Sequence, residues 1–410
     1  MGRVFLVIPL ALACFALLQT AQAVTPAPDG GHPGGNTAEG TNALFNRTTG
    51  VNNTAIGFEA LFIDSTGSFN TAVGWSALRD NNGSSNTATG NSALHDNQTG
   101  IQNTATGAGA LRMNTIGSFN TADGFQALAT NTTGIQNTAT GTEALTSNTT
   151  GPFNTATGWR ALFNNTTGDR NTAFGSRALI ANTTGFENTA IGRTALFNSR
   201  TARQNTAIGA EALESSTGSF NVALGWRAGV RVTTADGVIS IGTEVGENVP
   251  GSCYIGNIFG RPSPGGAAVF INSDRKLGTT TSSRRFKEEI KPMERASEAL
   301  FALKPVTFRY KKEIDAAGIS QFGLVAEDVE KINPDLVVRD KEGKPYSVRY
   351  DQVNTMLLNE FLKEHRKVEE QGAIIAKQQK QIEALAAGLQ KVSDQLEASK
   401  PAPQIVVGNQ

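Results

Sequence analysis

The most regular feature of the chain is the motif Asn-Thr-Ala-x-Gly, which recurs every 17 residues with two intervals of 16. In a unit such as 137–153, two variable residues follow it, then Ala144-Leu145 and the polar segment Asn148-Thr149-Thr150-Gly151. Apolar positions are therefore few and recur at fixed places. The units begin at Asn36, Asn53, Asn70, Asn86, Asn103, Asn120, Asn137, Asn154, Asn171, Asn188, Asn205 and, in degenerate form, Asn221.

Each unit predicts one coil of a β-solenoid, because it is too short for two helices. Thr-Ala-x-Gly and x-x-Ala-Leu are each long enough for a short strand, and Asn-Thr-Thr-Gly favours a turn since Asn and Gly accept positive φ. We expect two strands and two turns per coil, with twelve coils stacked at about 4.8 Å into a rod of roughly 55 to 60 Å. The first Asn predicts a ladder of side-chain amides, and Ala-Leu the inward layer. The Asn-x-Thr triplets are also formal glycosylation sequons, but they recur because the turn recurs.

The sixth position of the repeat carries large aromatic residues in several units: Phe58, Trp75, Phe125, Trp159 and Trp226. A coil with mostly Ala and one Leu buries little apolar area, so the core is thin. We interpret the aromatic side chains as buried between neighbouring chains; the alternative is an exposed stripe that binds a ligand. Both interpretations predict association rather than a monomer.

These Asn-x-Ala-x-Gly units resemble the head repeats of trimeric autotransporter adhesins over residues 36–229. The resemblance implies a parallel β-roll in a homotrimer. The adhesin repeats are usually shorter, so their register is not transferred. Residues 230–281 retain fragments of the pattern and predict a β neck, with a loop at 261–266 and a strand at 268–271.

Beyond residue 280 the composition changes and a new series of motifs appears. It runs from Thr-Thr-Ser-Ser-Arg-Arg-Phe-Lys at 280–287 through Leu-Lys-Pro at 303–305 and Gln-Phe-Gly-Leu-Val-Ala-Glu-Asp-Val at 321–329 to Val-Arg-Tyr-Asp at 348–351. This order resembles the endosialidase-type intramolecular chaperone, the self-cleaving C-terminal module of phage tail spikes and fibres. The resemblance implies a small α+β domain at 282–352 that drives trimerisation.

The same resemblance implies a catalytic Ser-Lys dyad, with cleavage directly before the serine and the lysine five residues later. The matching residues are Ser282 and Lys287, so the expected scissile bond joins Thr281 to Ser282. Two positions depart from the family pattern, which has Asp after the serine and an aliphatic residue before the lysine: here they are Ser283 and Phe286. Ser283 leaves the nucleophile ambiguous by one residue.

The chemistry demands a neutral lysine, because only that form takes the proton of a serine hydroxyl. Burial or nearby cations such as Arg284 and Arg285 favour the neutral form, whereas Glu288 and Glu289 oppose it. A spacing of five does not bring side chains together on a helix, so a loop or an assembled trimer must supply the geometry. The simpler alternative is a charged helix start over 285–290 with Ser282 or Ser283 as N-cap, in a clamp that does not cut.

Glu327 and Asp328 are the other carboxylates that invite a catalytic role. We expect them on the solvent side of a short amphipathic helix instead.

The last segment, 353–400, carries apolar residues spaced alternately four and three and predicts a coiled coil. Polar residues on this seam fix register and are compatible with a trimer. An intramolecular helical hairpin is the alternative. Pro401 and Pro403 end the helix, leaving a tail at 401–410. The seam comprises Leu357, Phe361, Glu364, Val368, Gln371, Ile375, Gln378, Ile382, Leu385, Leu389, Val392 and Leu396.

The first 23 residues predict a secretory signal peptide: Arg3, an apolar stretch to Leu18, and Ala21-Gln22-Ala23 before the cut. The apolar stretch is too short for a membrane anchor, and the surroundings of Cys14 do not fit a lipobox. We therefore expect a protein that is secreted or held at the cell surface, with a flexible lead-in at 24–35 and no membrane span after signal removal.

Composition narrows the function classes further. The 36 basic and 36 acidic residues cancel, and no lysine precedes Lys276, so a nucleic-acid surface is not expected. His32, His95 and His365 are widely scattered, which predicts no metal site, no cofactor and no Ser-His-Asp triad. The repeats lack the recurring paired carboxylates of a glycan-degrading spike.

The sequence as a whole predicts a mainly β protein: a β-solenoid shaft, a small α+β chaperone domain and a C-terminal trimeric coiled coil. Its expected function is a secreted homotrimeric fibre or adhesin whose chaperone domain cleaves itself once, between Thr281 and Ser282, with no external substrate. The alternative is a surface scaffold or adhesin that keeps the domain as a permanent trimer clamp. The ligand of the shaft is not identified by these residues.

Overall fold

The computed structural model describes residues 32–399, which fall into two compact units, 1–262 and 263–410. The expected signal peptide, most of the lead-in and the tail lie outside the described residues. Of the lead-in, 32–35 form a turn in which the backbones of His32 and Asn36 exchange two hydrogen bonds.

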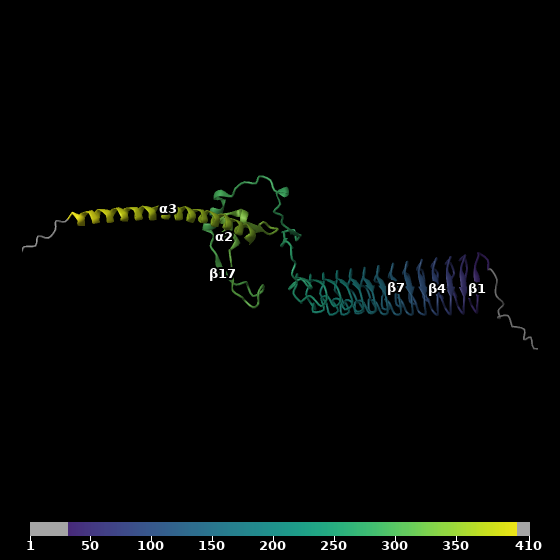
Figure 1. The fold of residues 1–410 in the computed structure, drawn as a ribbon. Helices are drawn as coiled ribbons and strands as arrows, with labels where there is room; N and C mark the ends of the chain where they lie inside the picture. Colours follow the sequence, from purple (N-terminus) through teal and green to yellow (C-terminus); the bar gives the residue numbers. More distant parts are fainter. Residues whose placement is uncertain (1–31, 400–410) are drawn as a thin grey trace, which may run out of the picture. The chain divides into compact units, whose positions relative to one another are not determined.

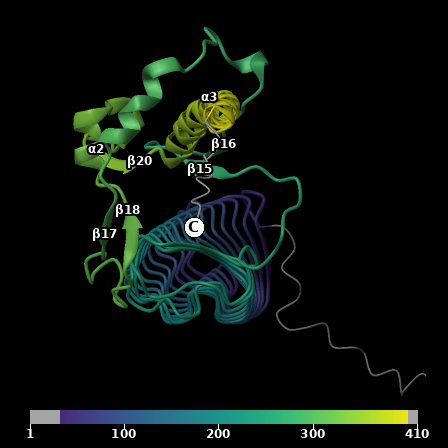
Figure 2. The ribbon, with the colours of Figure 1, turned by 60° about the vertical axis from the view of Figure 1, so that its left-hand side comes forward.

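The N-terminal unit is a β-solenoid built on one parallel sheet of fourteen strands (Figure 1). Each strand pairs with the next in chain order, and Ala lies against Ala at the centre of the register, as in Ala139 against Ala156. Viewed from the turned side, the coils follow one another with nearly the same outline (Figure 2). The strands are β1 (Thr37–Glu39), β2 (Thr54–Ile56), β3 (Thr71–Val73), β4 (Thr87–Thr89), β5 (Thr104–Thr106), β6 (Thr121–Asp123), β7 (Thr138–Thr140), β8 (Thr155–Thr157), β9 (Thr172–Phe174), β10 (Thr189–Ile191), β11 (Thr206–Ile208), β12 (Val222–Leu224), β13 (Ile239–Ile241) and β14 (Cys253–Ile255).

Each coil contains one strand, so the prediction of a second strand at x-x-Ala-Leu is wrong. Those residues form turns, because two of them have left-handed backbone: Glu143 has φ 58° and Leu145 has φ 52°. The Leu145 N–H still bonds to the next coil, at 3.0 Å from the carbonyl oxygen of Ala161. The segment therefore stacks between coils without being extended.

The interior is as thin as the sequence suggests. Ala at the centre of strands β1 to β12 and the Ala-Leu pair point inward, and Ala139, Ala144 and Leu145 are fully buried. In the regular coils the leucine is the largest apolar side chain in the core. The small volume of alanine allows the opposite walls of each coil to approach closely.

The predicted asparagine ladder at the first repeat position is present. The Asn137 backbone N–H donates to Asn120 Oδ1 at 3.0 Å, and its Nδ2 donates to the same oxygen at 3.2 Å and to the carbonyl oxygen of Gly151 at 2.9 Å. Asn137 Oδ1 in turn accepts from the backbone N–H of Asn154 at 2.9 Å. Buried amides thus satisfy backbone groups that the short strand leaves unpaired.

A second asparagine column, which the sequence analysis assigned only to a turn, is also buried. Asn148 Nδ2 donates to Asn131 Oδ1 at 2.8 Å and to the carbonyl oxygen of Gly151 at 3.0 Å. The column comprises Asn81, Asn97, Asn114, Asn131, Asn148, Asn165 and Asn182, all fully buried.

Asp64 occupies the same place one coil before Asn81 and is also fully buried. Neither carboxylate oxygen has a hydrogen-bond partner of good geometry. Burial raises the pKa of Asp64 to about 7, and the Gly67 N–H and the amides of Asn81 and Asn70 only partly oppose this effect. The second asparagine column is therefore preceded by a titratable residue, Asp64.

Glycine at the fifth repeat position permits the close stacking of coils. Gly158 has φ 126°, and a Cβ there would lie 2.7 Å from the carbonyl carbon of Gly175 in the next coil. A side chain would meet both backbone strain and backbone atoms.

The sheet extends into the range expected to be a neck, since β13 and β14 continue it as far as Ile255. Further on, the hairpin of β15 (Val269–Ile271) and β16 (Leu277–Thr279) belongs to the C-terminal unit.

The C-terminal unit is a small α+β arrangement. A cluster of Val329, Leu336, Val337, Val348 and Met356 forms its core. Its remaining elements are the 3-10 helices η1 (Arg284–Phe286), η2 (Glu294–Ala302) and η3 (Pro334–Leu336), the strand pairs β17 (Val306–Phe308) with β18 (Gln321–Gly323) and β19 (Val337–Arg339) with β20 (Pro345–Val348), and the helices α2 (Ala326–Ile332) and α3 (Tyr350–Ala398).

Helix α3 spans 49 residues, and only its first turns pack against the core, through Val353 and Met356. Its apolar seam is exposed; Phe361, Ile375 and Leu389, for example, are 67%, 64% and 73% exposed. Within residues 32–399 there is no second helix of similar length, so no intramolecular hairpin covers the seam. The coiled coil itself stays a prediction. No helix among the described residues is both long and apolar enough to cross a bilayer.

Candidate functional site

The expected scissile bond lies in an exposed, extended segment. Thr281 and Ser282 follow β16 and precede the single turn of η1, and both are exposed. The Thr281 hydroxyl accepts from the Ser283 N–H at 3.3 Å. The bond between Thr281 and Ser282 is therefore accessible.

Ser283 has a structural role as the N-cap of η1. Its hydroxyl accepts from the Arg285 N–H at 3.4 Å and from Arg285 Nε at 3.3 Å. The helix that it caps is only three residues long, so the charged helix expected over 285–290 in the simpler alternative is not formed. Since Ser283 is engaged in this cap, Ser282 is the better placed of the two candidate nucleophiles.

Lys287 closes the same turn as C-cap, donating its backbone N–H to the Arg284 carbonyl oxygen at 3.2 Å. Its side chain is exposed, and across the described part of the chain no hydrogen bond joins it to Ser282. A single chain thus holds the two predicted residues on one short turn without bringing their functional groups together. The dyad stays a prediction.

A different serine and lysine do meet, which the sequence analysis missed. Ser297 of η2 is fully buried, and Lys363 Nζ of α3 lies 3.4 Å from its hydroxyl. A carboxylate oxygen of Glu360 lies 2.6 Å from Lys363 Nζ and also accepts a hydrogen bond from the Ser297 hydroxyl. Asn359 Nδ2 donates to the same hydroxyl at 2.6 Å. Hydrogen bonds from Lys363, and then from Ser297, lower the pKa of Glu360 and favour its carboxylate form.

A lysine held as an ion pair is a poor base. The four side chains therefore attach η2 to the first part of α3 rather than forming a cleavage site. The only signal in the sequence is the Glu360 and Lys363 spacing on the helix, and it does not identify Ser297 as their partner.

Glu327 and Asp328 lie exposed in the first turn of α2, as expected. Lys331 Nζ donates to Asp328 at 2.8 Å and lowers the pKa of Asp328. A carboxyl group held in its ionised form does not serve as a general acid, which disfavours that role for Asp328.

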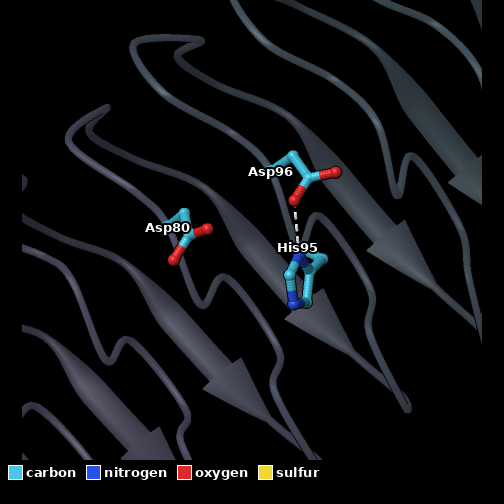
Figure 3. A group of neighbouring side chains, drawn as sticks. All are labelled: Asp80, His95 and Asp96. Atoms are coloured by element: carbon cyan, nitrogen blue, oxygen red, sulfur yellow. Dashed lines mark hydrogen bonds and ion pairs between the residues drawn. The ribbon is translucent and has the colours of Figure 1, made fainter.

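One histidine of the solenoid, His95, lies beside two carboxylates. Figure 3 shows His95 turned toward Asp96, with Asp80 on the adjacent coil. His95 Nδ1 lies 2.5 Å from Asp96 Oδ1. Arg79, however, bonds both oxygens of Asp80, at 3.0 and 3.2 Å. Because an arginine already neutralises Asp80, the group fits an ion-pair network between coils better than a metal site. In the sequence, the 16-residue interval between this repeat and the one before it aligns Asp80 with Asp96.

The aromatic residues at the sixth repeat position are about half exposed. Phe58 and Trp75 stack with ring centroids 6.3 Å apart, and Arg160 and Arg227 lie over the rings of Trp159 and Trp226 at 5.0 and 5.2 Å. Arginines of the same chain thus partly cover two of the three tryptophans.

In a comparison with curated proteins, no protein matched the chain. A comparison with protein-family models matched the segment that begins at the predicted nucleophile and ends in β19. Residues 282–338 match the family described as chaperone of endosialidase, which identifies this segment of the C-terminal unit as a domain of that kind.

Proposed function

We propose that the protein is a secreted homotrimeric fibre whose C-terminal unit is an intramolecular chaperone that drives trimerisation and then cuts the chain between Thr281 and Ser282. The solenoid is the fibre shaft. The observation that carries the proposal is the chaperone of endosialidase match at 282–338, directly followed by a long helix with an exposed apolar seam.

The seam supports self-association because an apolar heptad stripe needs partner helices to leave water. Linking three chains through α3 raises the effective concentration of their shafts. Charged residues off the seam, such as the exposed Lys367, keep the remaining faces of the helix solvated. A clamp of this kind sets the register of long repetitive chains that have many non-local pairings.

The proposed cleavage uses Ser282 as nucleophile. Its Oγ adds to the carbonyl carbon of Thr281 while Lys287, as the free amine, takes the hydroxyl proton and passes it to the Ser282 nitrogen. The C–N bond breaks and leaves an ester between Thr281 and Ser282 Oγ. That step also frees the Ser282 amine. Water then hydrolyses the ester, giving a carboxylate on Thr281 and restoring the Ser282 hydroxyl.

The exposed Lys287 of a single chain explains why such a cut would wait for assembly. We expect the packing of three chains around this segment to bring the Lys287 amine to the Ser282 hydroxyl and to exclude water from both. Cleavage after assembly removes the clamp from a finished fibre, so unfolding becomes hard to reverse.

Mass spectrometry of the expressed chain tests the proposal. We expect a C-terminal fragment of roughly 13 to 15 kDa, judged from its length at ordinary residue mass. Ser282→Ala and Lys287→Ala should abolish it, while Ser283→Ala, which removes only the N-cap, should retain it. A cut that persists in Ser282→Ala would overturn the dyad.

The second candidate function is a surface scaffold or adhesin that keeps the C-terminal unit as a permanent trimer clamp. The observation that favours it is the separation of Ser282 from Lys287 in the single chain. If a full-length trimer is the only mature species, the permanent clamp is favoured over self-cleavage. Export is tested separately: N-terminal sequencing of secreted material should begin at Val24.

A further inference from the structure

The outer face of the solenoid changes character along its length. In β4 to β8 the third strand residue is polar, being Thr89, Thr106, Asp123, Thr140 and Thr157. From β9 to β14 the same position is apolar in six consecutive coils. We name these residues the apolar column: Phe174, Ile191, Ile208, Leu224, Ile241 and Ile255.

The column is continuous and open to solvent. The register places each member directly beside the next, as Ile191 beside both Phe174 and Ile208. Phe174 is 58% exposed and Ile255 44%. With coils about 4.8 Å apart, the column runs for about 24 Å. The first strand residue adds further apolar side chains in the last coils, Val222 and Ile239.

Polar borders flank the column on both sides. On one side Arg227 pairs with Glu244 at 2.8 Å, and Arg193 pairs with Glu211. On the other, Gln204 Nε2 donates to Glu187 at 2.9 Å. An apolar centre with a polar border is the usual composition of a protein interface, and a continuous exposed apolar face is uncommon on a monomer.

We propose that the apolar column is the contact surface through which copies of this chain associate along the C-terminal half of the shaft, leaving the polar coils β4 to β8 unpaired. This inference rests on the proposed homotrimer and specifies which face of the shaft the copies share.

A second copy is the occupant because the matching surface repeats at the same spacing on every copy. Identical columns therefore align coil by coil. The border charges Arg193, Glu211, Arg227 and Glu244 already pair with one another within their own chain, so a second copy would not meet an unpaired charge at this border. In the chain, the coils that carry the column precede the C-terminal unit, which has the exposed heptad seam. A trimer would hold those coils together.

The aromatic stripe at the sixth position is a weaker alternative. It is interrupted by Asn91, Ala108, Thr142, Ser176, Arg193 and Ala210. Two of its tryptophans are already covered by arginines of their own chain. The apolar column has no such interruption from Phe174 to Ile255, although Leu224 within it is half-buried.

Cysteine cross-linking of the full chain tests the surface. Both native cysteines are first replaced, Cys14→Ser and Cys253→Ser. Ile208→Cys is then compared with Thr140→Cys, which has the same strand position in a polar coil. We expect short cross-linkers to join chains through position 208 in most of the protein and through position 140 only in traces.

Light scattering on the same samples separates the outcomes. A trimer in which both positions cross-link poorly, or equally, would overturn this surface while leaving the proposed trimer intact. A monomer would overturn both. As a second measurement, the double variant Ile208→Lys with Ile241→Lys should separate the shafts of the trimer, which spin labels would report as a loss of proximity. The matched double variant Thr106→Lys with Thr140→Lys should leave the shafts together. Equal effects of the two double variants would also overturn the surface.

Discussion

Replacing Asp64 with asparagine should complete the second asparagine column and stabilise the N-terminal coils above neutral pH. The Asp64 carboxylate is fully buried, and its oxygens have no hydrogen-bond partner of good geometry. An amide at this place would face the carbonyl oxygen of Gly67, the equivalent of the Gly151 oxygen to which Asn148 donates, while the preceding coil has Arg47 where Asn148 meets Asn131.

The magnitude follows from the raised pKa. A rise from 3.8 to about 7 corresponds to about 4 kcal/mol. The folded state binds the Asp64 proton more tightly than the unfolded state does. Ionisation of Asp64 therefore lowers the free energy of unfolding by nothing below pH 3.8, by progressively more as the pH rises toward 7, and by the full amount above 7. Asp64→Asn should therefore be nearly neutral in acid and stabilising in base.

Hydrogen exchange of peptides covering residues 53–81 measures the local opening free energy of these coils. A local measurement suits a solenoid whose coils open near an end. Wild type and Asp64→Asn are compared at each pH, so the intrinsic pH dependence of exchange cancels. The wild-type to variant rate ratio should stay near one at about pH 4 and rise toward an upper bound of about 10³ at pH 8.

The matched control is Asn148→Asp, which places the same carboxylate in the middle of the column. It should introduce the same pH dependence in peptides covering residues 131–165. A wild-type to Asp64→Asn ratio that does not change between pH 4 and 8 would refute the reasoning, because it would mean that Asp64 titrates as an exposed group.

Three further changes test other parts of the structure. Asn137→Ala should destabilise the shaft by about 2 to 4 kcal/mol in denaturant unfolding, because it leaves buried backbone groups unpaired; a loss below 0.5 kcal/mol would contradict the ladder. Gly158→Ala should cost at least about 1 kcal/mol from left-handed backbone alone, with a further penalty from contact with Gly175, and a neutral result would contradict the stacking. Leu385→Asp on the exposed seam should abolish the trimer in light scattering and with it the C-terminal fragment, whereas Lys391→Asp, off the seam, should retain both.

The solenoid could be predicted from the sequence because its period is strict and its turn residues are distinctive. The first asparagine ladder followed from the same repetition. The error at x-x-Ala-Leu arose because the pattern of small and apolar residues resembles a short strand, while a leucine with φ near 50°, such as Leu145, is uncommon enough to be unexpected. The role of Asn148 was missed because asparagine before Thr-Thr-Gly is typical of exposed turns.

The predicted site was identified by motif order and not by geometry. The family match begins at Ser282, but the distance from its hydroxyl to Lys287 is not encoded in local sequence. The Ser297, Glu360 and Lys363 group could not be foreseen for the same reason, since Ser297 is more than 60 residues from the other two. Contacts that depend on packing between distant segments leave no periodic signal.

The coils also differ in how they tolerate a change of length. Asn148 and Gly151 are three residues apart, whereas in a 16-residue coil the equivalent Asn81 and Gly83 are two apart, yet both asparagines remain buried and bond to the glycine carbonyl. The outer turn absorbs the missing residue, and the interior does not change. A whole coil can therefore be duplicated or removed by an in-frame exchange between neighbouring repeats. Each such event would alter the reach of the shaft by about 4.8 Å and create no new kind of contact.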